Sequence, residues 1–111
     1  MPHDDTLYVA HMLEAARKAA GKAAAVSEAQ FLADENLQLA LVHLIQVLGE
    51  AARRVSPATQ ARHPAIPWKG IIGMRHRVVH EYLEVDLGIV WKVVTDDLPP
   101  LVAVLEDIGA T

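Results

Sequence analysis

The stretch Pro67–Leu83, with the sequence PWKGIIGMRHRVVHEYL, decides how the rest of this chain is interpreted. At about 100° per residue, the spacing of an α-helix, its apolar side chains gather on one arc. These are Trp68, Ile71, Ile72, Met74, Val78, Val79, Tyr82 and Leu83. Arg75 falls in the middle of the arc. A guanidinium on a burying face is costly unless it meets a carboxylate or a bound anion, so this helix is expected to bring a cation to a partner.

Two histidines and two glycines accompany Arg75 in the same stretch. His76 and His80 stand one helical turn apart on one flank, and His80 lies about 140° from Arg75 around the helix axis. Gly70 and Gly73 fall on the polar side, where Ala would favour a helix by about 1 kcal/mol each. Packing alone does not account for this set of residues. The sequence therefore predicts that another group approaches this helix closely.

Length and composition indicate one domain, residues 1–111, that works in the cytoplasm. A chain of 111 residues can bury a single core, and its 52% apolar content weakly indicates an oligomer. No apolar run has the length of a membrane span, and the acidic N-terminus does not resemble a secretion signal. Without cysteine the chain has no disulfide and no thiolate nucleophile or metal ligand. We expect no cofactor and no membrane association.

Charge is distributed unevenly along the chain. The formal net charge of −4 argues against a protein that coats nucleic acid. From Ala51 to His80, however, there is no Asp or Glu. This window contains Arg53, Arg54, Arg62, Lys69, Arg75 and Arg77, together with His63, His76 and His80. Such a basic sector suits a focused anion site, for example for a nucleic-acid phosphate. It equally suits a solvated face or a surface that pairs with an acidic partner subunit.

Capping residues and apolar spacing predict the helices that precede the central stretch. A first helix is capped within residues 4–6 and ends near Ala25. Ser27–Gln30 forms a capping box that starts a short helical turn. Asp34 caps a long second helix that ends near Val55 and has apolar residues on two faces. A helix with so little polar surface is expected at the centre of a bundle or at an oligomer interface.

Proline and aspartate positions predict the remaining elements. The segment Ser56–Pro67 contains three prolines and is expected to be a loop with a short helical turn, and Pro67 suits the first position of the next helix. Asp86 can cap a further helix, which Pro99 and Pro100 end or kink before a final helix. The chain is therefore predicted to be all-α, an antiparallel up-and-down bundle of four to five helices.

Several polar residues near the central stretch have more than one interpretation. Glu50 is a candidate carboxylate for Arg75, and it is equally a plain surface acid. His76 and His80 have the i, i+4 spacing of two ligands to one metal ion. No third ligand has a recognisable spacing, so two unrelated histidines are the simpler interpretation and we predict no metal site. From the residues alone, Arg75 and Glu50 could form a structural ion pair, and Tyr82 is more simply a core aromatic residue.

An arginine and a histidine are sufficient to cleave RNA without a metal ion. The ribose 2′-hydroxyl is an internal nucleophile, so no water has to be activated. Histidine, with an ordinary pKa of about 6.5, can accept or donate a proton at neutral pH. Arginine binds the phosphate and stabilises the charge that grows on its oxygens. Many helices carry both residue types, so their spacing alone is a weak indication of this chemistry.

The run RHRVVHEY, Arg75–Tyr82, resembles the R-x4-H-x-Y motif of the HepT-like toxins, a branch of the all-α HEPN superfamily. Other segments resemble the same family, so the likeness covers nearly the whole chain. They are FLADENLQLAL (31–41), LGEAARRV (Leu48–Val55), PAIPWKGIIGMRHRVVHEYLEVD (Pro64–Asp86) and VWKVVTDDLPPL (Val90–Leu101). One residue departs from the usual pattern, because His76 stands where the family most often has Asn.

The resemblance implies a helical bundle that forms a homodimer, with the motif in a cleft at the dimer interface. It also implies a metal-independent endoribonuclease that acts on RNA, with tRNA among its targets. In this chain Arg75 would bind and stabilise the phosphate, and His80 would be the general acid and base. His76, Arg77 and Glu50 would have supporting or substrate-binding positions around them. The departure at His76 could alter the substrate or the pH response.

The resemblance further implies a partner protein. HepT-like toxins are encoded beside a minimal nucleotidyltransferase (MNT-type), the antitoxin, which attaches AMP to the motif tyrosine, here Tyr82. On a helix that continues to Leu83, Tyr82 lies within about 20° of Arg75. A phosphodiester on Tyr82 would then meet the Arg75 guanidinium. The alternative is a catalytically silent HEPN binding module that docks a nucleotidyltransferase without cutting RNA.

Overall fold

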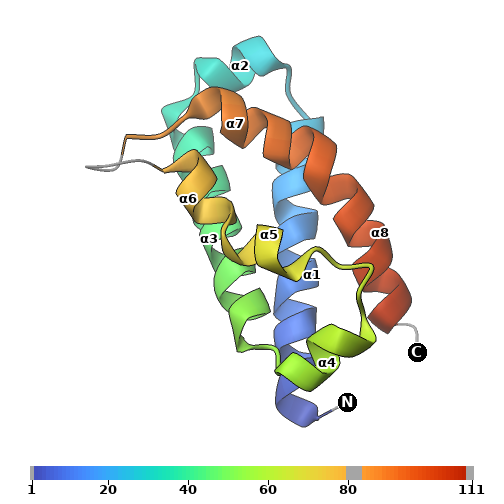
Figure 1. Ribbon diagram of the computed structural model, residues 1–111. Helices are drawn as coiled ribbons and strands as arrows, with labels where there is room; N and C mark the ends of the chain where they lie inside the picture. Colours follow the sequence, from blue (N-terminus) through green and yellow to red (C-terminus); the bar gives the residue numbers. More distant parts are fainter. Residues whose placement is uncertain (1, 80–83, 110–111) are drawn as a thin grey trace.

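Two long helices, α1 (His3–Ala24) and α3 (Glu35–Arg54), form an antiparallel pair in the computed structural model, which describes residues 2–79 and 84–109 (Figure 1). The short helix α2 (Glu28–Leu32) joins them at one end of the pair. Stacking of Phe31 on Trp91, with ring centroids 5.1 Å apart, attaches this connection to the C-terminal part of the chain. The two long helices therefore provide the frame on which the later segments pack.

Side-chain caps begin α2 and α3 at the residues that the sequence predicts. Ser27 Oγ accepts a hydrogen bond from the Gln30 N–H at 3.1 Å, and Gln30 Oε1 accepts one from the Ser27 N–H at 2.8 Å. This confirms the capping box. Asp34 Oδ1 accepts a hydrogen bond from the Leu37 N–H at 3.0 Å and confirms the predicted start of the second long helix.

The proline-rich segment after α3 contains the predicted helical turn, α4 (Pro57–Arg62). The Ser56 hydroxyl accepts a hydrogen bond from the Thr59 N–H at 3.4 Å, and Pro57 occupies the first turn, where an N–H donor is not needed. Beyond α4, the Trp68 indole N–H donates to the His63 carbonyl at 3.0 Å. That hydrogen bond closes the loop and leads the chain back toward α3.

Asp5 does not cap α1, contrary to the prediction of a capping residue within positions 4–6. The helix begins at His3, and its first residues have no side-chain cap. The carboxylate of Asp5 is only 4% exposed and instead accepts hydrogen bonds from groups near α4. Its donors are the Ser56 N–H at 2.9 Å, the Ser56 hydroxyl at 2.6 Å and the Thr59 hydroxyl at 2.5 Å. Asp5 thus joins the start of α1 to the start of α4.

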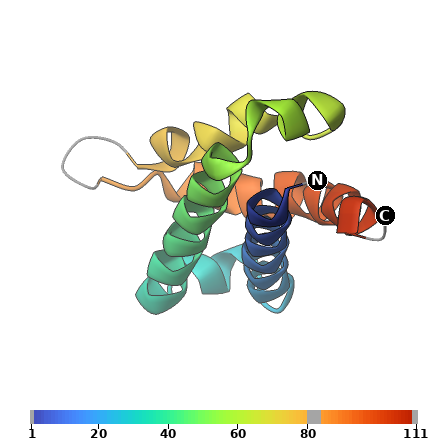
Figure 2. The same ribbon diagram turned by 90° about the horizontal axis from the view of Figure 1, so that it is seen from below.

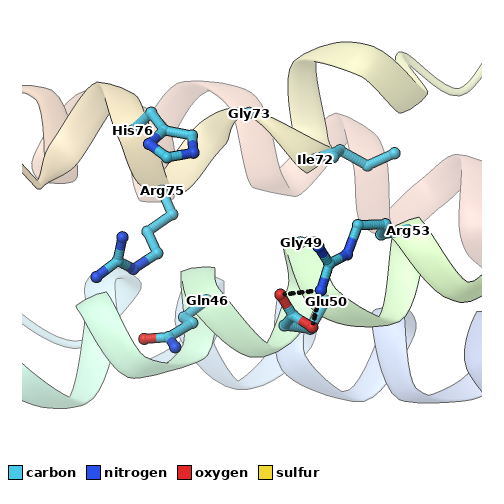
Figure 3. A pocket seen from close by; sticks show the side chains of 8 residues that line it. All are labelled: Gln46, Gly49, Glu50, Arg53, Ile72, Gly73, Arg75 and His76. Carbon is cyan, nitrogen blue, oxygen red and sulfur yellow. Dashed lines mark hydrogen bonds and ion pairs between the residues drawn. The ribbon is translucent and has the colours of Figure 1, made fainter.

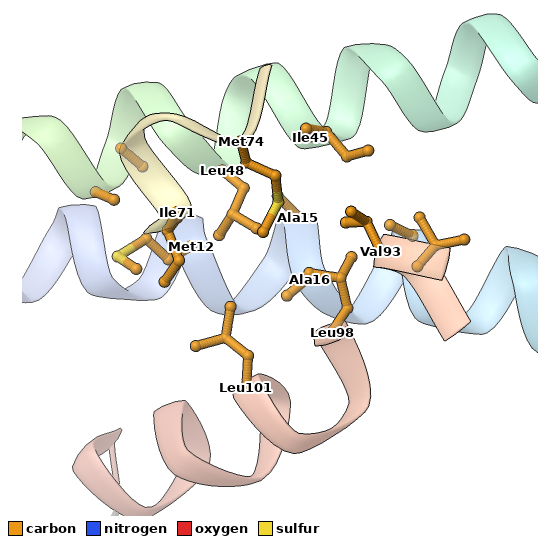
Figure 4. Packing of buried hydrophobic residues seen from close by; sticks show 14 of the residues in the cluster. Met12, Ala15, Ala16, Ile45, Leu48, Ile71, Met74, Val93, Leu98 and Leu101 are labelled. Atoms are coloured by element: carbon orange, nitrogen blue, oxygen red, sulfur yellow. The ribbon is translucent and has the colours of Figure 1, made fainter. Parts of the chain in front are cut away.

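The hydrophobic core lies where α1 and α3 meet the later helices (Figure 4). From α1, small residues such as Ala15 and Ala16 let the neighbouring helices approach closely. From α3, Ile45 and Leu48 are fully buried. Met12 of α1 is also labelled, and the other labelled members come from later segments: Ile71, Met74, Val93, Leu98 and Leu101. The residues that the sequence assigns to the apolar arc of the central stretch, as far as Val79, mostly belong to this core.

The central stretch is not one helix. It forms α5 (Trp68–Ile72) and α6 (Met74–Val78), separated at Gly73. Pro67 is the N-cap of α5, which begins at Trp68, whereas the prediction placed Pro67 at the first position inside the helix. The prediction of a continuous helix to Leu83 is therefore wrong, although both pieces keep their apolar sides in the core. Glycine has a low helix propensity, and tertiary packing of α5 decides where the break falls.

Extended backbone replaces the helix after Val78. Val79 has φ −117° and ψ 119° and forms an isolated antiparallel bridge with Val85. The Asp86 N–H donates to the Val78 carbonyl at 2.7 Å, so the ends of the 80–83 segment are held together. The adjacent β-branched residues Val78 and Val79 favour this change of conformation. Residues 80–83, which include the predicted site residues His80 and Tyr82, lie outside the described part of the chain.

The C-terminal segments form one continuous helical rod. Asp86 Oδ1 accepts a hydrogen bond from the Ile89 N–H at 3.1 Å and begins α7 (Leu87–Lys92), as predicted. A π-helical segment, η2 (Val93–Asp97), then leads directly into α8 (Leu98–Gly109). The chain therefore stays helical through Pro99 and Pro100, contrary to a helix end there. Both prolines lie in the first turn of α8, directly after the π-helical segment, and each removes one backbone N–H donor from the rod.

The helices pack as an all-α domain in which α5 and α6 contact α3 and α8 contacts α1 (Figure 2). The all-α class is as predicted. The described residues form more helical segments than the four to five predicted, because α2 and α4 are short separate helices and the central stretch is split in two. Within residues 2–79 and 84–109, no helix combines the length and apolar character needed to cross a membrane.

We predict that Asp5→Asn destabilises the fold at neutral pH. Hydrogen bonds from the Ser56 side chain, the Thr59 side chain and the Ser56 N–H lower the pKa of the Asp5 carboxyl below its ordinary value. Its contribution to stability is therefore present above the pKa of the unfolded chain and is lost as the pH falls through the folded-state pKa.

Thermal unfolding followed by circular dichroism across a pH series measures this effect. The difference between wild type and Asp5→Asn should shrink in acid, while Asp4→Asn, at an exposed neighbouring position, should change the midpoint little at any pH. Equal effects of the two substitutions would contradict a specific role for the buried carboxylate.

Candidate anion-binding site

A pocket of about 350 Å³ lies between α3 and the α5–α6 segment (Figure 3). Its lining residues are Gln46, Gly49, Glu50, Arg53, Ile72, Gly73, Arg75 and His76. The α3 residues among them recur every three or four positions and so share one face of that helix. The others surround the break at Gly73. The pocket thus depends on how α5 and α6 are held against α3.

Gly49 is the point at which α3 and α5 approach most tightly. An added Cβ at this position would lie 3.2 Å from the Ile71 carbonyl oxygen and 3.6 Å from that of Ile72. At Gly70 and Gly73, where the sequence predicts a close approach, an added Cβ meets only atoms of the same segment, at 4.0 and 3.4 Å. The close approach therefore exists, but the glycine that permits it is on α3.

Arg75 lies on α6 with its guanidinium directed toward α3 above Gln46 (Figure 3). The residue is half-buried. Among the residues that the structure describes, its guanidinium has no hydrogen bond and no ion pair. A partly buried cation without a carboxylate partner attracts an anion, which is the second of the two possibilities that the sequence left open.

Glu50 pairs with Arg53 and not with Arg75, so of the alternatives that the sequence left open, the Arg75–Glu50 ion pair is not formed. Arg53 Nη2 lies 2.7 Å from Glu50 Oε2 and 2.9 Å from Oε1. Arg53 stands three residues after Glu50 on the same helix, within easy reach of its carboxylate, whereas Arg75 must reach across from α6. Glu50 is therefore paired with Arg53, and its carboxylate does not offset the charge of Arg75 directly.

The two basic residues that follow Arg75 occupy different places. His76 is exposed and lines the pocket, as a supporting role requires. Arg77 does not line it: its Nη1 lies 3.8 Å from Asp97 Oδ2 at the side of the C-terminal rod. Of the three residues predicted to support Arg75, His76 and Glu50 are thus brought into the pocket and Arg77 is not.

His80 and Tyr82 cannot be assigned to the pocket by helical geometry. The angles that relate them to Arg75 assume a helix that continues past Val78, where α6 ends. Both residues lie outside the described part of the chain. Their assigned roles stay predictions from the motif. In the described ranges, no group of three or more His, Asp or Glu side chains is arranged to hold a metal ion.

Sequence reasoning missed Gln46, Gly49 and Arg53 as pocket residues. A signal for them is present, because positions 46, 49, 50 and 53 form the polar stripe of an otherwise apolar helix. Such a stripe indicates a side of α3 that carries polar side chains, although Gly49 within it is buried against the Ile71 carbonyl. It does not indicate which segment faces it, because that segment lies about twenty residues later.

Fold and pocket together define a class of protein: an all-α domain whose pocket, suited to an anion, contains a half-buried guanidinium with no partner in the described part of the chain. Sequence comparison gives the particular family. The sequence model of the family described as "Ribonuclease HepT-like" matches residues 12–108, and the chain belongs to this family. The match includes every residue that lines the pocket.

Individual relatives agree with this assignment. "Probable ribonuclease HepT" of Thermococcus cleftensis is 35% identical over 71 residues, which are 64% of this chain and 64% of that protein. "Putative RNase TTE0752" of Caldanaerobacter subterraneus subsp. tengcongensis is 30% identical over 94 residues, 85% of this chain and 84% of the relative. "Gamma-glutamylcyclotransferase and putative RNase MJ0434" of Methanocaldococcus jannaschii is 32% identical over 101 residues. These are 91% of this chain but only 46% of that longer relative. No solved structure matches the chain.

We predict that Gly49→Ala destabilises the protein, because the added methyl group presses on the Ile71 carbonyl. Overpacking usually costs about 1–3 kcal/mol, and the helix propensity of Ala offsets about 1 kcal/mol of that cost. Gly21→Ala is the matched control. Gly21 lies in α1 with nothing within 4 Å of an added Cβ, so the same substitution should stabilise the protein by up to about 1 kcal/mol. Urea denaturation measures both, and a neutral Gly49→Ala would show that α5 can move freely.

Proposed function

We propose that this protein is a metal-independent endoribonuclease that acts on RNA, with tRNA among its substrates, and works as a homodimer. The observation that carries the proposal is the Arg75 guanidinium, which lines the pocket without a partner among the described residues. Arg75 is also the first residue of the R-x4-H-x-Y motif, in a chain of the HepT-like ribonuclease family. A phosphodiester supplies the negative charge that this pocket lacks. Arg75 would hold it and stabilise the additional charge of the transition state.

The cleavage step follows from the chemistry of RNA. The ribose 2′-oxygen attacks the adjacent phosphorus, the bond from phosphorus to the 5′-oxygen of the next nucleotide breaks, and a cyclic phosphate and a 5′-hydroxyl result. The 2′-hydroxyl loses a proton and the leaving oxygen gains one, and His80 provides this general acid–base catalysis. His76, which lines the pocket, supports the bound phosphate. Arg75 balances the charge on the non-bridging oxygens.

A second copy of the chain is the proposed partner in the dimer. The face of α3 that lines the pocket is apolar nearer the start of the helix. There Leu39 is 59% exposed and Val42 is half-buried. Leu39 precedes Gln46 by about two helical turns and Val42 by about one, on the same face. An exposed apolar patch next to the pocket supports an interface that would place two pockets close to each other.

We further propose that the protein is the toxin of a toxin–antitoxin pair. Its partner is a minimal nucleotidyltransferase that transfers AMP to the Tyr82 hydroxyl: the tyrosyl oxygen bonds to the α-phosphorus of ATP and pyrophosphate leaves. The added phosphodiester brings a negative charge and a bulky base to Tyr82, the last residue of the motif. Competition of this phosphate with RNA for Arg75 would silence the toxin.

The second candidate function is a catalytically silent HEPN binding module that docks the nucleotidyltransferase. The observation in its favour is His76, which replaces the usual Asn within the motif. Such a module would share the bundle, the dimer and the modified tyrosine. It would differ from the toxin in one measurable respect, because the purified protein would bind its partner but cut no RNA.

We expect purified wild-type protein to cut total tRNA equally with and without EDTA. Arg75→Ala and His80→Ala should each lower the rate about a hundredfold or more, since general acid–base catalysis alone contributes about 10²–10⁴-fold. Lys92→Ala, at an exposed position of α7, is the charge-removing control. Intact folding of all variants is checked by circular dichroism. No cleavage by the wild type would favour the silent module, and loss of cleavage in EDTA would favour a metal site.

Tyr82→Phe should leave tRNA cleavage in place but make it resistant to the partner nucleotidyltransferase and ATP. The expected mass increase of one AMP in the wild type, absent from Tyr82→Phe, is measured by mass spectrometry of the intact proteins. A Tyr82→Phe protein that is still fully silenced by the partner's catalytic activity would disprove this mechanism of neutralisation.

A further inference from the structure

The pocket contains a second guanidinium, that of Arg53, whose donors are only partly used. Both of its hydrogen bonds to Glu50 come from a single nitrogen, Nη2. A guanidinium has five N–H donors, so Nε and Nη1 are free of any bond to Glu50. The side chain is 62% exposed, and the ion pair holds its planar group at the edge of the pocket. Arg53 can therefore keep Glu50 and bind an anion at the same time.

The two arginines lie toward opposite ends of the pocket (Figure 3). Arg75 lies above Gln46, whereas Arg53 lies beside Glu50, and Gln46 and Arg53 are seven residues apart on α3. Seven residues correspond to about 10 Å along a helix. The Gln46 carboxamide, which can both donate and accept hydrogen bonds, belongs to the same stripe. Two cations toward opposite ends of one pocket suit an extended chain of phosphates better than a single small anion.

The size and charge of the pocket agree with this arrangement. Its volume of about 350 Å³ lies at the lower end of the range for small-ligand sites, about 300–1,000 Å³. Glu50 is the only acid in its lining, as far as the structure describes the chain, and offsets Arg53 in part. Arg75 adds an uncompensated positive charge. An ion pair as exposed as Glu50–Arg53 is weak, so a phosphate can share or displace the carboxylate.

We infer that Arg53 binds a second phosphate of the same RNA strand, so that the α3–α6 pocket holds one nucleotide between a phosphate at Arg75 and a phosphate at Arg53. This inference rests on RNA as the substrate, as proposed above. It makes Arg53 a substrate-binding residue away from the reacting phosphorus. Glu50 then tunes affinity, because its charge opposes the phosphate that Arg53 attracts.

Salt dependence of binding tests the inference directly. The probe is a short, fluorescently labelled single strand of 2′-O-methyl RNA, which has no free 2′-hydroxyl and so cannot be cut. For single strands, log K falls with log salt concentration by about 0.7 for each phosphate that the protein neutralises. Fluorescence anisotropy across a series of potassium chloride concentrations gives this slope for each variant of the full chain.

Arg53→Gln should reduce the slope by about 0.7, and Arg75→Gln should reduce it by the same amount. Arg54→Gln is the matched control, because Arg54 is the next residue of α3, carries the same charge and does not line the pocket. It should leave the slope unchanged. Glu50→Gln should tighten binding several-fold at low salt, because it removes the pocket's negative charge with little change of shape.

Each outcome has one meaning. Equal slopes for Arg53→Gln and Arg54→Gln would overturn the second phosphate contact, and weaker binding by Glu50→Gln would overturn the opposing role of the Glu50 charge. If the wild type still cuts tRNA in that case, the proposed ribonuclease stands without this subsite. If the wild type neither cuts tRNA nor binds the probe, the proposed function and the inference both fail. Unfolding midpoints equal to wild type show that a changed slope reflects lost binding.

Discussion

The contact between the backbone of α3 and the backbone of α5 is the constraint on which the site depends. At Gly49 there is little room for a side chain, because an added Cβ would lie 3.2 Å from the Ile71 carbonyl oxygen, a tight contact. This approach brings the break at Gly73, and with it Arg75 and His76, over the polar stripe of α3. The adjoining residues Leu48 and Ile71 are buried in the core, so hydrophobic packing holds the same contact from the inside.

Electrostatics inside the pocket follow from which partner Glu50 takes. An acid on α3 can meet a base on its own helix or on α6, and the nearer Arg53 has it, at 2.7 Å. The result is a pocket with one compensated and one uncompensated guanidinium. A fixed positive charge that folding does not neutralise lowers the stability of the fold, and such features are typical of functional sites. The chain belongs to a family whose relatives are named as ribonucleases, and RNA carries phosphates that such a positive charge can bind.

Long-range contacts also account for where the central stretch departs from a single helix. Its apolar periodicity is helical throughout, and the buried positions Trp68, Ile71, Met74 and Val78 follow it. Periodicity reports which residues face the core, but it does not report continuity. The bridge between Val79 and Val85 and the hydrogen bond from the Asp86 N–H to the Val78 carbonyl end the helix early. Angular arguments that extend to His80 and Tyr82 therefore lose their basis, while the motif itself does not.

The sequence by itself determined the features that depend on neighbouring residues: the all-α class, the caps at Ser27, Asp34 and Asp86, the apolar faces and the family motif. Each of these is settled within one or two helical turns. Only the tertiary structure decided that Asp5 binds Ser56, that Gly49 admits α5, and that Glu50 leaves Arg75 unpaired. These outcomes depend on competition between residues far apart in the chain, and the free energies of the competing partners are set by distances that a linear sequence does not contain.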